Sequence, residues 1–267
     1  MKLALKVDVP TLRGTRDGVP RLLELLQKHR IQASFFFNLG PNSRFFPGPE
    51  TGRLCAAILQ RVSAAGHEAG IHAYNSSLWK HQAAQADALW TQAQMRQASE
   101  RFGEIFKDAP RIHGAPDWQM NLHAFRLTQR LGFDYGCDTR GTCPFVPIVR
   151  AEIIACPQLP TTLPTLDEAL ASKGKDGALQ YLLKLTENPP PTGHIYTLRA
   201  EREGRKLAPL FELLIEGWRR QGYALTTTRT LFEALETKHL PRHEVAMSKL
   251  PGSNRMQMLQ TREFLAG

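Results

Sequence analysis

The sequence is poor in cysteine and contains no C-x-x-C pair. Cys55, Cys137, Cys143 and Cys156 are scattered, so they offer neither the ligand spacing of a structural zinc site nor a disulfide framework. In a reducing compartment scattered cysteines are free thiols, and we assign these four no function.

A second absence is that of long apolar runs. No stretch is long enough to span a bilayer, and Met1 leads almost directly into a strand-like segment without the apolar core of a signal peptide. We therefore expect a cytoplasmic protein that is neither secreted nor inserted in a membrane.

The chain also has no stripe of lysine and arginine interleaved with aromatic residues, so we expect no nucleic-acid partner. Its formal net charge of +9 is spread over many segments. A dispersed positive charge suits weak attraction to phosphates or anionic lipid heads.

What the sequence does contain is a repeated alternation of strand-like and helix-like segments. At 267 residues, 42% of them hydrophobic, the chain suits one large α/β domain. Successive βα units with short joints predict a parallel barrel or a doubly wound sheet. The expected strands are 3–9, 33–38, 69–72, near 112, around 135, 153–155, 194–198 and 223–226. The expected helices are 17–29, 52–65, 81–102, 122–131, 177–186, 207–221 and 230–235.

The pattern fades from Thr237 onward, where the chain becomes basic and is broken by proline and glycine. We therefore expect a barrel domain over 1–236 and a basic C-terminal tail over 237–267.

Two polar residues follow apolar strands. Asp8 lies near the end of the first expected strand, and His72 ends the third. Because the parallel strands of a barrel end at the same face, both side chains would face one mouth, where barrels carry their chemistry. Taken by itself, Asp8 is equally compatible with an acid that merely terminates a strand. The choice between a functional and a structural role therefore depends on other segments of the chain.

Six short motifs then occur in order along most of the chain. They are Asp8-Val9-x-Thr11, Arg13-Gly14-Thr15-Arg16-x-Gly18, Gly70-Ile71-His72-Ala73, Arg140-Gly141, Leu163-Pro164-Thr165-x-Asp167-Glu168 and Tyr196-Thr197-x-x-Ala200-Glu201. Together they resemble the polysaccharide deacetylase (NodB-homology) superfamily, and most closely its bacterial branch that deformylates undecaprenyl-phosphate-linked formamido-arabinose in lipid A modification. The resemblance implies a distorted (β/α) barrel of fewer than eight strands. It also implies a small-molecule or lipid-linked amino sugar as partner, with at most peripheral contact at the inner membrane.

In that family one aspartate is a general base, and a second aspartate and two histidines hold a divalent metal. A further histidine, late in the sequence, is a general acid. The resemblance makes Asp8 the base and His72 the one matching metal ligand. Where the family has its second aspartate this chain has Pro10, and where it has its second histidine the chain has Ser76, preceded by Asn75. Proline and serine are poor ligands for a transition metal.

The catalytic positions later in the chain are altered as well. The family's Trp-Arg pair falls near Asp117-Trp118, and Arg199 stands where the family has its catalytic histidine. An arginine cannot release a proton near neutral pH, so the general-acid step is missing.

Amide hydrolysis at neutral pH needs an activated water, which a metal supplies, and a proton for the departing amine. With both parts replaced, we expect a hydrolase of carbon–nitrogen bonds by descent whose turnover is lost or strongly reduced, a pseudoenzyme without a metal cofactor. The alternative is an altered site that His67, His81, His113 or Asp117 completes, with zinc, cobalt or nickel as its metal.

Three arginines are candidates for holding an anionic group of the ligand. They are Arg16 beside the turn glycines, Arg140 in the Arg-Gly motif, and Arg199 at the altered catalytic position. Asp167 and Glu168, by contrast, are expected to cap a helix.

The family branch carries a long apolar insertion, associated with the membrane, between its second strand and the His67-Glu68 segment. Only 40–53 occupies that place here, with Phe45 and Phe46 as a remnant. The short insertion puts access to a lipid-linked substrate in question.

Three functions are compatible with these observations. The first is a degenerate deacylase that binds an anionic amino sugar, and the second is an active amide hydrolase with a non-standard site. The third is a non-catalytic scaffold whose pocket is vestigial.

Overall fold

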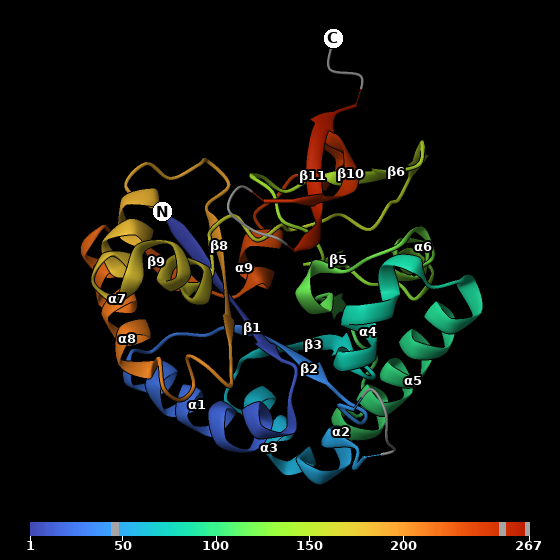
Figure 1. Cartoon of the computed structure of the whole chain (residues 1–267), viewed down its shortest axis with the longest axis horizontal. Coiled ribbons are helices and arrows are strands. Elements are labelled where there is room, and N and C mark those ends of the chain that lie inside the picture. Colours follow the sequence, from blue (N-terminus) through green and yellow to red (C-terminus); the bar gives the residue numbers. More distant parts are fainter. Residues whose placement is uncertain (44–47, 251–254, 265–267) are drawn as a thin grey trace.

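The computed structural model describes residues 1–43, 48–250 and 255–264. A curved sheet of seven parallel strands runs through its middle in the order β5-β4-β3-β2-β1-β8, with β9 pairing to β1 (Figure 1). The expected distorted barrel with fewer than eight strands is thereby confirmed. The strands of this sheet are β1 (Lys2–Val9), β2 (Ser34–Asn38), β3 (Glu68–Ala73), β4 (Ile112–His113), β5 (Tyr135–Gly136), β8 (His194–Arg199) and β9 (Ala224–Thr226).

Strand β1 is the centre of the sheet. It pairs with β2, β8 and β9, and every residue from Leu3 to Val9 is buried. Successive side chains of a strand point to opposite faces, so Leu3, Leu5 and Val7 pack into the large apolar core. Ala4 packs into a smaller apolar cluster, and Lys6 and Asp8 lie on the same side of the strand as Ala4.

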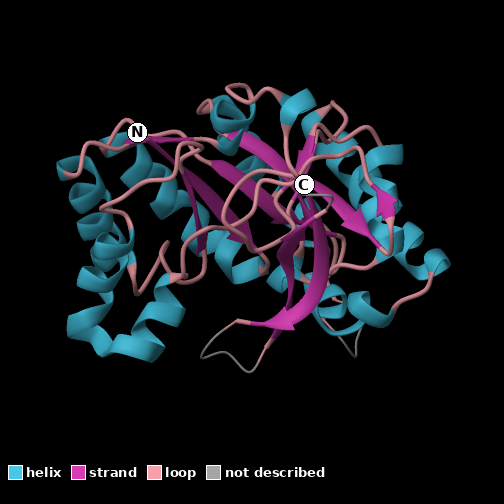
Figure 2. Ribbon diagram, turned by 90° about the horizontal axis from the view of Figure 1, so that it is seen from above, coloured by secondary structure: helices cyan, strands magenta, loops and turns pink. Residues whose placement is uncertain are grey.

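Helices lie around the outside of the sheet, as Figures 1 and 2 both show. The large apolar core includes buried side chains of these helices and of the strands they cover. The helices are α1 (Val19–Lys28), α2 (Thr51–Leu54), α3 (Ala56–Ala64), α4 (Ser76–Gln82), α5 (Ala88–Phe106), α6 (Leu122–Arg130), α7 (Leu166–Leu185), α8 (Ala208–Arg220) and α9 (Thr228–Phe232), with short turns η1 (Gly14–Gly18), η2 (Ala83–Gln85), η3 (Pro116–Trp118) and η4 (Thr237–His239). None of the helices in the described ranges is both long and apolar enough to cross a membrane.

Two helical segments differ from the sequence expectation. The single helix expected over 81–102 is divided, since the side chain of Asp87 accepts a hydrogen bond from the Trp90 amide and starts α5 anew. The chain is already helical from Leu166, where Thr165 and Glu168 form a capping box. This segment, α7, is interrupted at Gly174, whose φ of 69° and ψ of −178° are not helical, so the helix expected at 177–186 follows that break. The capping function predicted for this segment is thus confirmed for Glu168.

A second, four-stranded sheet in the order β11-β10-β6-β7 was not expected. It consists of β6 (Val146–Val149), β7 (Glu152–Ile153), β10 (Arg242–Lys249) and β11 (Met256–Glu263). The strand predicted at 153–155 therefore belongs to this sheet and not to the barrel. The segment expected as a tail supplies β10 and β11, which project at one side in Figure 1. Most side chains of both strands are exposed or partly exposed, so the sequence shows no continuous apolar run there. Phe45 and Phe46 lie outside the described residues.

Gly18 marks a place where two backbone segments touch. Its φ of −89° and ψ of −45° suit any residue. A Cβ atom at this position, however, would lie 2.0 Å from the carbonyl oxygen of Ala200, just beyond β8. Glycine is required here for space and not for conformation, and the contact holds η1 against the end of β8.

We expect Gly18→Ala to destabilise the protein by about 1–3 kcal/mol, because backbone at this contact has to move. Thermal or urea unfolding measures the loss. Gly103→Ala in the interior of α5 is the matched control, since its new methyl group would meet nothing closer than 3.8 Å. That variant should be neutral or stabilised by up to about 1 kcal/mol. Equal effects of the two substitutions would contradict the close contact.

Candidate functional site

The C-terminal ends of the parallel strands enclose a cavity of about 280 Å³. It brings together the residues that the sequence placed at the mouth, namely Asp8, His72, Asp117, Trp118 and Arg199. The remaining lining residues are Pro10, Thr11, Asn42, Ser76, Ser77, Lys80, His81, Pro116 and Glu201.

Lys6 lies directly behind Asp8 in the interior of the barrel. Its side chain is fully buried, and its ammonium group contacts Asp8 Oδ1. The Nζ atom also lies 5.1 Å from the ring centre of Phe36 and 5.7 Å from that of Trp118, where a cation is attracted to the aromatic faces. Sequence reasoning missed Lys6, although a lysine two residues before an acid on a buried strand must share its face.

His72 is held as a neutral imidazole. Its Nδ1 atom lies 2.5 Å from the carbonyl oxygen of Gly114, which can only accept, so Nδ1 donates and Nε2 keeps its lone pair. The same Nδ1 atom lies 3.9 Å from Asp8 Oδ1. Burial lowers the pKa of His72 to about 4, against a smaller opposing effect of Asp8. At neutral pH His72 is therefore a hydrogen-bond acceptor toward the cavity.

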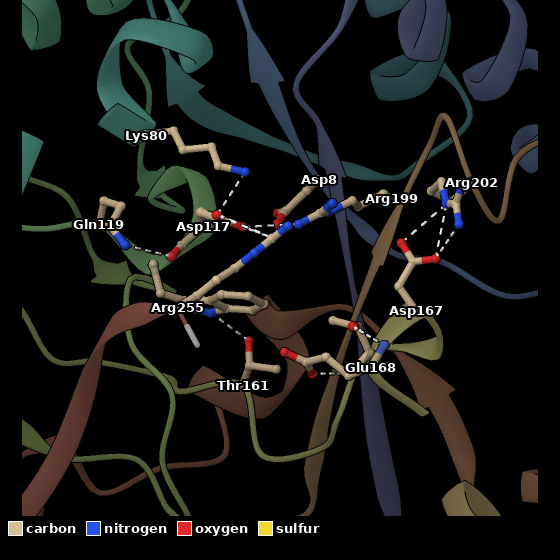
Figure 3. Close-up of polar contacts among 12 residues, drawn as sticks. Asp8, Lys80, Asp117, Gln119, Thr161, Asp167, Glu168, Arg199, Arg202 and Arg255 are labelled. Atoms are coloured by element: carbon tan, nitrogen blue, oxygen red, sulfur yellow. Dashed lines mark hydrogen bonds and ion pairs between the residues drawn. The ribbon is translucent and has the colours of Figure 1, made fainter. Parts of the chain in front are cut away.

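Three cations converge on the carboxylate of Asp117 at the mouth (Figure 3). Lys80 Nζ lies 2.9 Å from Oδ2, Arg199 Nη2 lies 3.0 Å from Oδ1, and Arg255 Nη1 lies 3.4 Å from Oδ1. Burial alone would raise the pKa of Asp117, but Lys80, Arg199 and Arg255 together hold it below its usual value. Arg255 immediately precedes β11, so the segment expected as a tail reaches the site.

The backbone that carries Asp117 is strained. Asp117 and Trp118 have φ values of 53° and 52°, in the left-handed region that non-glycine residues rarely adopt. Trp118 Nε1 donates to Thr161 Oγ1 at 3.1 Å, and the three cations hold Asp117. The surroundings therefore fix a conformation that the chain alone would not favour.

Two further polar groups of the cavity wall have unused hydrogen-bonding capacity. Ser76 is 4% exposed, and its hydroxyl has no hydrogen-bond partner among the described residues. The same holds for Glu201 Oε2, which is buried although Glu201 lines the cavity. Burial raises the pKa of Glu201, and the negative charge of Asp8 adds to this effect.

The donor set does not fit the divalent metal that the family resemblance implies. Pro10 offers no side-chain ligand, Ser76 offers only a hydroxyl, and Asp8 is already neutralised by Lys6. His81 and Asp117 line the cavity, whereas His67 and His113 do not. In the ranges that the structure describes, no three histidine, cysteine, aspartate or glutamate side chains are grouped so that they could hold a metal ion.

Two of the three arginines predicted to hold an anion do not line the cavity. Arg16 is exposed and pairs with Asp17 at 2.7 Å. Arg140 is buried, pairs with Glu168 at 3.1 Å and stacks 4.5 Å from the ring centre of Trp118. Neither side chain lines the cavity, because a motif gives the position of a residue in the chain but not the direction of its side chain.

The remaining altered positions have structural explanations. Asn75 caps α4, since its side chain accepts a hydrogen bond from the Leu78 amide. Burial alone would lower the pKa of the Arg199 guanidinium, but the negative charges of Asp117, Glu201, Asp8 and Asp167 together raise it, so Arg199 stays charged.

Comparison with known proteins agrees with the fold. The family model described as polysaccharide deacetylase matches residues 5–136. A Shewanella sediminis protein assigned as a 4-deoxy-4-formamido-L-arabinose-phosphoundecaprenol deformylase is 31% identical over 256 residues, covering 80% of either chain. A Wigglesworthia glossinidia brevipalpis protein with the same assignment is 25% identical over 275 residues, covering 90% of this chain and 95% of its own. A solved Mycobacterium smegmatis structure assigned as a polysaccharide deacetylase superposes with a TM-score of 0.70 at 18% identity, over 93% of this chain and 94% of the other.

Glu203 supports the strand end that carries Arg199. It is 2% exposed, and its Oε2 atom accepts a hydrogen bond from the Arg199 amide at 2.9 Å. Burial raises the pKa of Glu203 to about 8. The folded protein therefore holds a proton on Glu203 that the unfolded chain releases at a lower pH.

We expect Glu203 to make the protein less stable as the pH rises from about 5 to about 8, since the folded carboxyl group must then lose its proton in a buried place. Glu203→Gln keeps the acceptor oxygen and should remove this part of the pH dependence. Thermal unfolding at both pH values tests it, with Glu216→Gln on the exposed side of α8 controlling for the loss of one carboxylate. A wild-type pH profile in Glu203→Gln would contradict the assignment.

Proposed function

Because the chain belongs to the polysaccharide deacetylase family, we propose that its cavity binds an anionic amino sugar of the kind its relatives act on, without the metal-dependent hydrolysis of that family. The curated relatives are assigned to a formamido-arabinose linked through phosphate to undecaprenol. A sugar phosphate, free or carried by a lipid, is therefore the proposed ligand class. A lipid-linked ligand would bring the protein to the membrane surface.

The observation that carries the proposal is the charge at the mouth. Lys80, Arg199 and Arg255 all contact the carboxylate of Asp117, so three cationic side chains are gathered beside the cavity. Deeper in the cavity, Lys6 and Asp8 neutralise each other. Cationic side chains held in place by a carboxylate are well suited to bind phosphate oxygens.

The absence of hydrolysis is proposed from the chemistry of the residues present. No described group of ligands suits a metal that would activate water, and Arg199 cannot protonate a departing amine. His72 is neutral and fixed by Gly114, so it can orient a ligand by accepting a hydrogen bond. The chain's residues therefore support binding and orientation and not turnover.

Reversal of two substitutions tests the metal argument. We expect the wild-type protein to bind no stoichiometric zinc, cobalt or nickel, and Pro10→Asp with Ser76→His to bind about one ion per chain, because the two changes restore an aspartate and a histidine beside His72. Metal analysis and calorimetry measure this, with Pro10→Asp alone as control. Adding Arg199→His should then give measurable deformylation. One metal ion per wild-type chain, lost together with activity in His72→Ala, would falsify the proposal.

The charge argument predicts which cations matter for binding. Lys80→Met and Arg255→Met should each weaken the binding of an arabinose phosphate about tenfold, since a hydrogen bond to a charged group contributes about 1.5–3 kcal/mol. Raising the salt concentration should weaken wild-type binding. Arg16→Met removes an exposed cation outside the cavity and is the matched control. Calorimetry that finds no difference among the three variants contradicts the proposed phosphate site.

A further inference from the structure

Arg140 is a buried arginine that lies beside the cavity without lining it. Its side chain is 6% exposed, and its guanidinium carbon lies 4.5 Å from the ring centre of Trp118. The Glu168 carboxylate accepts hydrogen bonds from Nη1 at 3.1 and 3.2 Å, and the carbonyl oxygen of Leu163 accepts one from Nη2 at 3.3 Å. The guanidinium group is therefore held in one place against the indole ring, where a cation is attracted to the aromatic face.

Trp118 transmits this support to its neighbour Asp117. Both residues have a backbone φ in the left-handed region, which persists only where the surroundings hold it. The indole ring is held by the stack with Arg140 and by its hydrogen bond to Thr161. Because the three cations of the mouth converge on Asp117, a shift of Trp118 would move the point at which these cations meet.

The backbone of Arg140 joins the parallel sheet to β11. Its amide donates a hydrogen bond to the carbonyl oxygen of Met258 at 2.9 Å, and its own carbonyl oxygen accepts one from the Gln260 amide at 2.8 Å. Arg255 immediately precedes β11 and contacts Asp117. The hydrogen bonds of the Arg140 backbone therefore help to set how Arg255 reaches the mouth.

Gly141 leaves the room that this contact needs. A Cβ atom at this position would lie 2.3 Å from Gln260 Oε1 and 2.8 Å from Gln260 Cβ. The same Oε1 atom accepts a hydrogen bond from the Thr142 amide at 2.7 Å. The Arg-Gly motif thus places β11 by its backbone, while the arginine side chain supports Trp118.

From these contacts we propose that Arg140 is a positioning residue, which holds the parts of the proposed phosphate site in place without touching the ligand. Its side chain acts on Asp117 through Trp118, and its backbone acts on Arg255 through β11. The inference rests on the proposed function, because the ligand whose binding Arg140 affects is a sugar phosphate.

Arg140→Met tests the side-chain route by calorimetry with an arabinose phosphate. We expect this variant to bind about threefold to tenfold more weakly than the wild-type protein, because the stack on Trp118 loses its cation. Wild-type affinity in Arg140→Met would overturn the inference and leave the proposed function intact. A wild-type protein that binds no arabinose phosphate would overturn the proposed function itself.

Arg229→Met is the matched control for the loss of a stacked, ion-paired arginine. Arg229 pairs with Glu68 and Asp134 and lies 5.1 Å from the ring centre of Tyr135, at the N-terminal ends of the parallel strands and away from the cavity. We expect it to lower thermal stability and to keep the wild-type affinity. A loss of affinity equal to that in Arg140→Met would mean that general destabilisation explains both variants, and would overturn the inference.

A double-mutant cycle with Asp117→Asn separates positioning from direct action on the ligand. If Arg140 acts through Asp117, Arg140→Met should weaken binding by less than about twofold once Asp117 has been replaced. A loss in that background as large as in the wild-type background would contradict the positioning role.

Gly141→Ala tests the backbone route, and it does so even if Arg140→Met does not fold. Its methyl group would displace Gln260 and with it β11, so we expect a loss of affinity of up to about tenfold, as in Arg255→Met. The double variant of Gly141→Ala with Arg255→Met should bind no more weakly than Arg255→Met alone. Gly103→Ala is the control. Wild-type affinity in Gly141→Ala, or additive losses in the double variant, would contradict the role of the motif.

Discussion

The ion pair between Lys6 and Asp8 is the constraint on which the site depends. Both side chains lie inside the barrel, and an unpaired charge there would cost about 3–5 kcal/mol. The pair therefore fixes the position of Asp8 and leaves it neutralised without any bound ion. Gly114 packs against the same place, since a Cβ atom there would lie 2.7 Å from the ring of Phe36 and 3.1 Å from Lys6 Cε. The residue types around the pair are set by the need to hold a buried ammonium group.

The charges of the cavity are separated by depth. Lys6 and Asp8 form an ion pair in the interior, whereas Lys80, Arg199 and Arg255 meet at Asp117 at the mouth. Asp117 holds the cations in place, and its strained backbone aims it at them.

Much of the architecture and part of the site could be predicted from the sequence. The apolar run ending at Asp8 and the strand ending at His72 were sufficient to place both at one mouth, because parallel strands end at a common edge. Lys80, Arg255 and Glu203 could not be found in this way, since their roles depend on contacts between segments far apart in the chain. The pair β10 and β11 was missed for the same reason, because many of its side chains are exposed and it joins the second sheet through the pairing of β10 with β6. Arg140 matched a family motif, yet it stacks on Trp118 beside the cavity instead of lining it.

The position of Arg255 in the chain has a consequence for biosynthesis. Every strand of the parallel sheet precedes it, so the barrel and the buried pair of Lys6 and Asp8 can form while the ribosome is still translating. The mouth is completed only when β10 has paired with β6, β11 has paired with β10, and the Arg140 backbone has bonded with Met258 and Gln260. A nascent chain therefore forms its parallel sheet before all the charged residues of the mouth are in place. A product truncated before Arg255 would keep the fold of that sheet and lack one of the three cations at the mouth.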